Sequence, residues 1–446
     1  MNRMKKTLIK NATVVNEGVI GNYDILIENN IISKIEPEIE ENGAKEINAE
    51  GLHLFPGIID DQVHFREPGL THKGEIYTEA KAAVAGGVTS FMEQPNTKPP
   101  AITVEELEKK YTRAAECSLA NYSFLMGTTN DNIEELKKCD YSKVAGVKIF
   151  MGSSTGNMLV DNVKTLENVF SQINAIIVTH CEDDVMIKER QKHMIEEYGE
   201  DLPAYFHPII RNDDACYRSS SFAVELAKKH NTRLHVFHIS SAKELGLFTN
   251  KIPLKEKRIT SEVCIHHLWF SDEDYKTKGN FIKWNPSVKT VYDRDKLFAA
   301  MLDGTIDVVA TDHAPHTIEE KSLPYLQAPS GGPLIQHSLQ AMLQFHKQGR
   351  ISLEKIAEKM CHNVADLFKI KNRGYIREGY YADLALVNLN TSQTVNKSNL
   401  LYKCGWSPFE GYTFNSVVEK TFVNGNLVYD HGNFDESAKG ERLLFG

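Results

Sequence analysis

The chain has 446 residues, of which 41% are apolar and 25% are charged, and its formal net charge is −9. A chain of that length is too long for one small hydrophobic core, and it fits a barrel of about 250 residues with an accessory domain. The acidic balance, with no basic stripe of interleaved aromatic residues, argues against a nucleic-acid partner, and no apolar run approaches the roughly 20 residues of a membrane helix.

The cysteines and the first residues bear on the compartment. Seven cysteines are scattered along the chain and none forms a C-x-x-C pair, which is typical of reduced thiols. The early apolar stretch is short and is broken by Lys10 and Asn11, unlike a signal peptide. These features predict a cytoplasmic protein.

Both ends of the chain read as short strands separated by turns. The segment "VNGNLVYD" near the C-terminus places Asn-Gly between apolar runs, which is a hairpin signal. We expect the two ends to meet in one small β-sandwich domain, built from residues 1–55 plus 372–446.

The middle of the chain, residues 56–371, alternates buried-type strands with amphipathic segments such as "TVEELEKKYTRAAEC". Eight such β/α units predict an α/β fold, a (β/α)₈ TIM-type barrel. The eight strand candidates are residues 57–65, 89–96, 121–129, 146–153, 175–183, 234–241, 260–268 and 306–314.

Ligand-type side chains recur where these strands end, and the carboxyl ends of barrel strands build the active site. Each one alone fits a structural residue or a helix cap. Five of these residues, namely His64, Lys148, His180, His238 and Asp312, lie on five different strands. Together they indicate a metal site, because imidazole and carboxylate suit Zn²⁺ and similar ions. These strand-end residues are His64, Asn96, Lys148, His180, His238, His266 or His267, and Asp312.

Lys148 stands inside the apolar run "AGVKIFMG". A buried ammonium is costly unless it is paired or neutralised, and a lowered pKa makes the amine nucleophilic. A neutral lysine can take up CO₂ as a carbamate whose two oxygens bridge two metal ions. The alternative is a lysine that reaches the barrel mouth or binds substrate.

Ordered motifs across most of residues 55–340 resemble those of the dihydroorotases of the amidohydrolase superfamily. The resemblance implies a metal-dependent barrel, a β domain from both termini, and two zinc ions, often with a carboxylated lysine. The matching segments are "FREPG", "QPNTKP", "GVKIFMGSSTGNM", "VTHCED", "HISS", "SEVCIHHL", "KWNPSVK" and "IDVVATDHAPH".

By that resemblance, His64, carboxylated Lys148 and Asp312 hold one zinc ion, and Lys148, His180 and His238 hold the other. The "HISS" match selects His238 as the ligand, so His235 is interpreted as structural.

Gln62 departs from the family pattern, because the chain has Q-V-H where the family has H-x-H. Strand alternation still points residues 62 and 64 to the same face. Three alternatives are open. Gln62 coordinates through its amide oxygen, a water held by the amide replaces the ligand, or the first metal ion binds weakly.

Recognition of a carboxylate separates dihydroorotate from hydantoins and dihydropyrimidines. Arg66 lies just past the first strand, and its planar fork suits a carboxylate. By resemblance, Asn96 and His316 complete that clamp and Asn285 contacts the ring. Asp312 is the expected catalytic residue, which takes a proton and returns it to the leaving ring nitrogen.

The expected function is therefore the reversible conversion of L-dihydroorotate and water to N-carbamoyl-L-aspartate in pyrimidine biosynthesis. One alternative is an allantoinase- or hydantoinase-type cyclic amidase. Another is a non-catalytic dihydroorotase-like protein that binds a partner such as aspartate carbamoyltransferase, and Gln62 is its only support. A homodimer is expected from the frequency of twofold symmetry.

Overall fold

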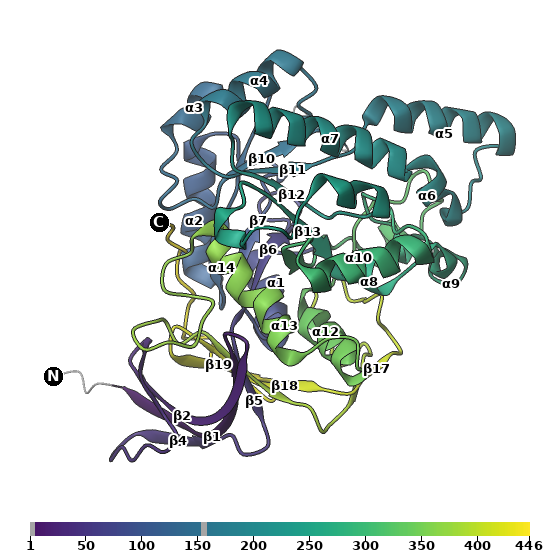
Figure 1. Ribbon diagram of the computed structural model, residues 1–446. Helices are drawn as coiled ribbons and strands as arrows, with labels where there is room; N and C mark the ends of the chain where they lie inside the picture. Colours follow the sequence, from purple (N-terminus) through teal and green to yellow (C-terminus); the bar gives the residue numbers. More distant parts are fainter. Residues whose placement is uncertain (1–4, 153–157) are drawn as a thin grey trace.

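The structure is a computed structural model that describes residues 5–152 and 158–446. Residues 153–157 of the quoted segment at 146–158 lie outside the described part. The described chain forms a parallel barrel and a large sheet from both ends (Figure 1). This confirms the predicted fold class.

The barrel has eight strand positions, as the sequence predicts. All neighbouring pairs are parallel. The barrel closes where the backbone N–H of His64 donates to His313 O at 2.7 Å. Its strands are β6 (Ile58–Val63), β7 (Val88–Glu93), β8 (Asn121–Phe124) with β9 (Met126–Gly127), β10 (Val147–Phe150), β11 (Ile177–His180), β12 (Leu234–Val236), β13 (Ile259–Cys264) and β14 (Val308–Ala310).

Helices follow most barrel strands, and polar caps fix their ends. The side chain of Asn212 accepts from Ala215 N at the start of α7, and Asn231 ends that helix with a φ of 53°. The helices are α1 (Ile76–Ala85), α2 (Val104–Cys117), α3 (Ile133–Lys138), α4 (Val163–Gln172), α5 (Asp184–Tyr198), α6 (His207–Ile210), α7 (Asp213–His230), α8 (Ile265–Trp269), α9 (Tyr275–Lys278), α10 (Val291–Asp303), α11 (Ile318–Lys321), α12 (Ser338–Lys347), α13 (Leu353–Ala357) and α14 (Asn363–Phe368).

The two ends share one nine-stranded sheet, in the order β20-β19-β18-β15-β5-β1-β2-β3, with β4 beside β1. The predicted hairpin lies at Asn424 and Gly425, which both have positive φ between β18 and β19. Its strands are β1 (Lys6–Asn16), β2 (Val19–Glu28), β3 (Ile31–Glu36), β4 (Lys45–Asn48), β5 (His53–Pro56), β15 (Leu384–Asn388), β18 (Val417–Val423), β19 (Asn426–Asp430) and β20 (Asn433–Phe434); β16 (Gln393–Thr394) and β17 (Thr413–Phe414) pair separately.

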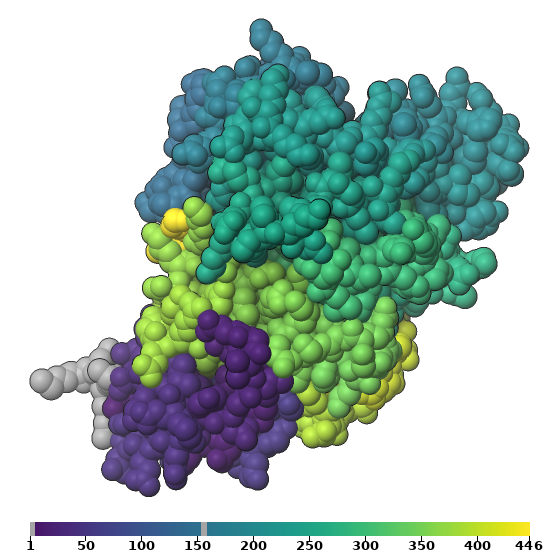
Figure 2. Space-filling model, in the orientation of Figure 1, coloured from purple at the N-terminus to yellow at the C-terminus, as the bar shows by residue number. Residues whose placement is uncertain are grey.

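Sheet and barrel are joined closely. Gly57 is the only residue between β5 of the sheet and β6 of the barrel, and a Cβ there would lie 2.0 Å from Thr89 Oγ1. In Figure 2 the N-terminal residues, in purple, pack directly against green residues of the last third of the chain. Among the described residues, no helix has the length and apolar character needed to cross a bilayer.

Candidate active site

A small polar cavity of about 90 Å³ lies at the carboxyl ends of the barrel strands. It collects side chains that the sequence predicts for one site, from seven strands or the segments after them. Those in its lining are Gln62, His64, Arg66, Asn96, Lys148, His180, His238, Asn285 and Asp312. His316 is the predicted site residue that is not in the lining.

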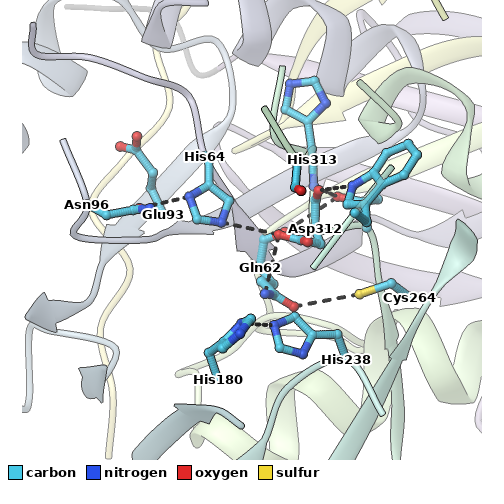
Figure 3. Close-up of polar contacts among 12 residues, drawn as sticks. Gln62, His64, Glu93, Asn96, His180, His238, Cys264, Asp312 and His313 are labelled. Atoms are coloured by element: carbon cyan, nitrogen blue, oxygen red, sulfur yellow. Dashed lines mark hydrogen bonds and ion pairs between the residues drawn. The ribbon is translucent and has the colours of Figure 1, made fainter. Parts of the chain in front are cut away.

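Two histidine rings face each other at the ends of β11 and β12. His180 Nδ1 lies 2.9 Å from His238 Nε2 (Figure 3). Glu182 accepts from His180 Nε2 at 2.9 Å and is itself held by Arg211 at 2.9 and 3.0 Å. A proton on Nε2 leaves the lone pair on Nδ1, which is the arrangement of a metal-binding histidine supported by a carboxylate.

Lys148 projects from β10 and is 1% exposed. Its Nζ lies 4.2 Å from the ring centroid of Phe237 and 4.8 Å from that of Phe150. Burial lowers the pKa of Lys148 to about 7. Within residues 5–152 and 158–446 it has no hydrogen bond or ion pair, so this amine fits conversion to a bridging carbamate.

His64 and Asp312 meet across the seam of the barrel. His64 Nε2 lies 3.2 Å from Asp312 Oδ1, and two ligands on one tetrahedral zinc ion lie roughly 3.3 Å apart. Burial raises the pKa of Asp312 to about 7, and burial also holds the pKa of His64 well below its usual value. The donor set, with its imidazole and carboxylate groups and a lysine amine that has no polar partner in the described chain, fits a metal centre.

Arg66 is 7% exposed and lines the cavity beside the ligand-type groups. It donates from Nε to Pro315 O at 3.0 Å, and its Nη2 lies 3.0 Å from His316 Nε2. Neither neighbouring acid neutralises it, because Glu67 pairs with Arg113 and Glu93 pairs with Lys110. A buried guanidinium without a carboxylate partner in the described chain suits an anionic ligand.

His316 contacts Arg66 but is not among the residues that line the cavity. Its Nδ1 lies 3.0 Å from Lys73 Nζ, and its Nε2 also lies 3.0 Å from Ser330 O. This position supports the guanidinium, and the direct contact of His316 with substrate stays a prediction.

Two asparagines complete the lining. Asn96 Oδ1 lies 2.8 Å from His64 Nδ1, so Asn96 orients that ring. Asn285 Oδ1 is buried and has no hydrogen-bond partner among the described residues. An orphaned buried acceptor at a cavity is a plausible contact for a substrate N–H.

The backbone is strained where three of these side chains start. Arg66, His238 and Asp312 have φ of 72°, 38° and 48°. Such left-handed conformations are costly for non-glycine residues and cluster at functional sites.

The sequence reasoning missed Glu182 and Trp284. Glu182 stands two residues after His180 in "VTHCED", and this alternation on an extended chain was the available signal. Trp284 lines the cavity, donates to Asp312 O at 3.2 Å and stacks on His266. His266 and His267 lie on α8, because β13 ends at Cys264, and they do not line the cavity.

Comparison with known proteins assigns the family. The sequence profile of the amidohydrolase family matches residues 53–428. The chain belongs to the amidohydrolase family. This amidohydrolase is 33% identical to the dihydroorotase of Methanosarcina acetivorans, over 98% of this chain and 94% of the relative. It is 32% identical to the dihydroorotase of Listeria innocua, over 95% of this chain and 99% of the relative.

Solved structures agree on the fold. The L-hydantoinase (dihydropyrimidinase) from Arthrobacter aurescens superimposes with a TM-score of 0.90 at 25% identity, covering 97% of both chains. These comparisons confirm the resemblance to dihydroorotases that the sequence motifs indicate. This amidohydrolase is an enzyme that hydrolyses cyclic amides.

Proposed function

We propose that this amidohydrolase is a dihydroorotase, which interconverts L-dihydroorotate plus water and N-carbamoyl-L-aspartate in pyrimidine biosynthesis. One observation carries the choice of substrate. Arg66, buried and not paired with a carboxylate in the described chain, shares a cavity with the ligand-type residues. A ring carboxylate would meet its fork there. The curated relatives that bear the name dihydroorotase support the same choice.

Zinc is the proposed metal. His64 and Asp312 would hold one ion, His180 and His238 would hold the other, and a carboxylated Lys148 would contribute to both. When bound, the metal supplies Lewis-acid polarisation of the amide carbonyl and a lowered pKa of water. The imidazole and carboxylate donors suit Zn²⁺.

The remaining chemistry belongs to the chain's own side chains. Asp312, whose pKa burial raises to about 7, takes a proton from the attacking water and returns it to the leaving ring nitrogen. Arg66 and Asn96 bind the substrate carboxylate, and Asn285 accepts from a ring N–H. His316 contacts the Arg66 guanidinium and holds it in place.

Hydrolysis of L-dihydroorotate by the purified, zinc-supplied protein tests the proposal. We expect turnover of about 1 s⁻¹ or more, as is ordinary for enzymes. Hydantoin, dihydrouracil and allantoin are the comparison substrates, and all three lack a ring carboxylate. Activity on these three with none on dihydroorotate would contradict the proposal.

A hydantoinase-type activity is the second candidate, favoured by the structural likeness to the L-hydantoinase. The same panel separates the two, because a hydantoinase gains nothing from Arg66. Correctly folded protein that is inactive on the whole panel would favour the non-catalytic, partner-binding role.

We place the protein in the cytoplasm as a homodimer acting on a small anionic substrate, with no nucleic-acid partner. The seven cysteines are all free and buried, which supports a reducing compartment. The division into residues 1–55 plus 372–446 and residues 56–371 stays a prediction. Limited proteolysis would test this division, and the mass of the protein in solution would test the homodimer.

A further inference from the structure

Gln62 stands at the position where the family motif has a metal-binding histidine, and the structure shows what its amide does. Its Nε2 lies 3.4 Å from Asp312 Oδ1, and its Oε1 lies 3.6 Å from Cys264 Sγ (Figure 3). Both ends of the amide therefore already face a protein group.

Electrostatics fix which end of the amide faces which group. A carboxylate accepts only, so the amide NH₂ is favoured beside Asp312, and a flipped amide would set two acceptors against each other. The thiol of Cys264 has a proton to give, so the amide oxygen is favoured beside it. The orientation with nitrogen toward Asp312 satisfies both contacts at once.

Burial makes this orientation matter. Gln62 is 1% exposed and Cys264 is 0% exposed, so water does not compete for either end of the amide. Burial and nearby carboxylates raise the pKa of the Cys264 thiol well above its usual value, which keeps its proton in place. Glu262 Oε1, 3.7 Å from Cys264 Sγ, is a second acceptor for that proton. The contact with Asp312 therefore constrains the Gln62 amide more strongly than the contact with Cys264 does.

Asp312 needs such a constraint. Its backbone is left-handed, with a φ of 48°, and its Oδ1 accepts from Gln62 Nε2 at 3.4 Å. His64 Nε2 lies 3.2 Å from the same oxygen, but the proton of that ring is on Nδ1, beside Asn96 Oδ1. The Gln62 N–H, which comes from β6, is therefore the contact that sets the rotation of the carboxylate.

We propose that Gln62 is a positioning residue and not a metal ligand. Its amide N–H orients the Asp312 carboxylate, and the Cys264 thiol keeps the amide oxygen turned toward itself. The role of Asp312 in turnover rests on the proposed function, whereas the statement about metal ligation does not.

Cobalt substitution tests ligation directly. The wild-type protein and a Gln62→Met variant are loaded with Co²⁺, and their visible spectra and metal ions per chain are compared. We expect the same number of metal ions per chain, because the variant keeps the proposed ligands, and a spectrum that changes at most through the reoriented Asp312 carboxylate. Gln94→Met is the matched control, since Gln94 is also buried at the end of the neighbouring strand and has no side-chain partner among the described residues.

Kinetics test positioning. We expect Gln62→Met to lower kcat by about 10- to 100-fold through misplacement of Asp312, with KM nearly unchanged. Cys264→Ala should lower kcat by roughly 2- to 10-fold, the effect of one ordinary hydrogen bond. Cys264→Ser keeps a donor and should restore most of that loss.

The outcomes are distinct. A changed cobalt spectrum with a metal ion lost in Gln62→Met, but not in Gln94→Met, would overturn the proposal by making the amide a ligand. Unchanged metal content with unchanged kcat would overturn the positioning role. Wild-type protein that binds cobalt but does not hydrolyse dihydroorotate would contradict the proposed function, while the metal content of the variants would still decide the question of ligation.

Discussion

Several side chains at the carboxyl ends of the barrel strands are buried although a polar group on each lacks a partner in the described chain. Lys148 has an amine without a polar partner, Asn285 has an orphaned acceptor, and Arg66 has no carboxylate, all within the described chain. Burying such groups is costly unless a ligand satisfies them. Their concentration in one cavity is therefore the physical mark of a binding and catalytic site.

Asp312→Asn removes the group that moves the proton while keeping its size. We expect turnover of dihydroorotate to fall by about 10²- to 10⁴-fold. Steady-state kinetics give the effect, and an unchanged thermal midpoint shows that the fold is intact. Activity within about tenfold of wild type would contradict the assignment of Asp312 as acid and base.

Arg66→Ala removes the proposed carboxylate fork. We expect KM for dihydroorotate to rise roughly 10- to 100-fold, which corresponds to a charge-assisted hydrogen bond of about 1.5–3 kcal/mol. Arg113→Ala is the control, because Arg113 pairs with Glu67 at 2.8 Å and does not line the cavity. An unchanged KM in Arg66→Ala would rule out the clamp.

At the scale of elements, periodicity and turn residues were enough to predict the barrel. Each of the eight expected strands exists, and the Asn-Gly hairpin lies at Asn424. The break of the third strand at Leu125 and the early end of β13 at Cys264 were not predictable, because buried strand and buried helix segments share one apolar pattern.

The orientations of the side chains within the site were harder to predict from the sequence. Strand alternation placed Gln62 and His64 on one face, but the orientation of the Gln62 amide depends on Asp312 and Cys264, 250 and 202 residues away. His316 follows Asp312 in the same motif, yet it contacts the Arg66 guanidinium and is not among the residues that line the cavity. Such details depend on tertiary contacts that no local pattern encodes.

The start of α12 carries a pH-sensitive contact. Burial lowers the pKa of His337, the residue before α12, to about 3, and its Nδ1 lies 3.1 Å from Tyr402 Oη. The folded-state pKa lies below the unfolded value of about 6.5, so the unfolded chain binds a proton first as the pH falls. Stability from this group is complete above pH ~6.5 and declines toward pH ~3.

His337→Gln should therefore make the protein less sensitive to acid. Between pH 7 and pH 5 we expect the wild type to lose about 2 kcal/mol more stability than the variant. Urea unfolding at both pH values measures this difference. His72→Gln is the control, since that side chain is 57% exposed, and equal losses in wild type and His337→Gln would contradict the prediction.

At the scale of the whole molecule, one buried polar network ties the sheet to the barrel. Asp383, just before β15, pairs with Arg373 and accepts from Asn121 of β8 at 3.1 Å. Asn424, in the β18–β19 turn, donates to Asn121 Oδ1 at 2.8 Å. Arg373 and Asp383 are each 3% exposed in their side chains, so neither is shielded by water.

Asp383→Ala should destabilise the whole protein, because it leaves the Arg373 guanidinium buried without its main partner. The expected cost is about 3–5 kcal/mol. Glu108→Ala, which breaks an exposed pair with Arg442, should cost at most about 1 kcal/mol. Thermal unfolding compares the two, and similar shifts in both would show that the buried network does not couple the two parts.

The single residue between β5 and β6 also limits how the chain can be shortened. Removing the first 56 residues would leave β15 without its partner β5, and β15 is the apolar run Leu384–Asn388. An unpaired, apolar strand edge is a template for pairing with another molecule. Protein that lacks the first 56 residues should therefore aggregate, and trimming at the N-terminus is best confined to the residues ahead of Lys6.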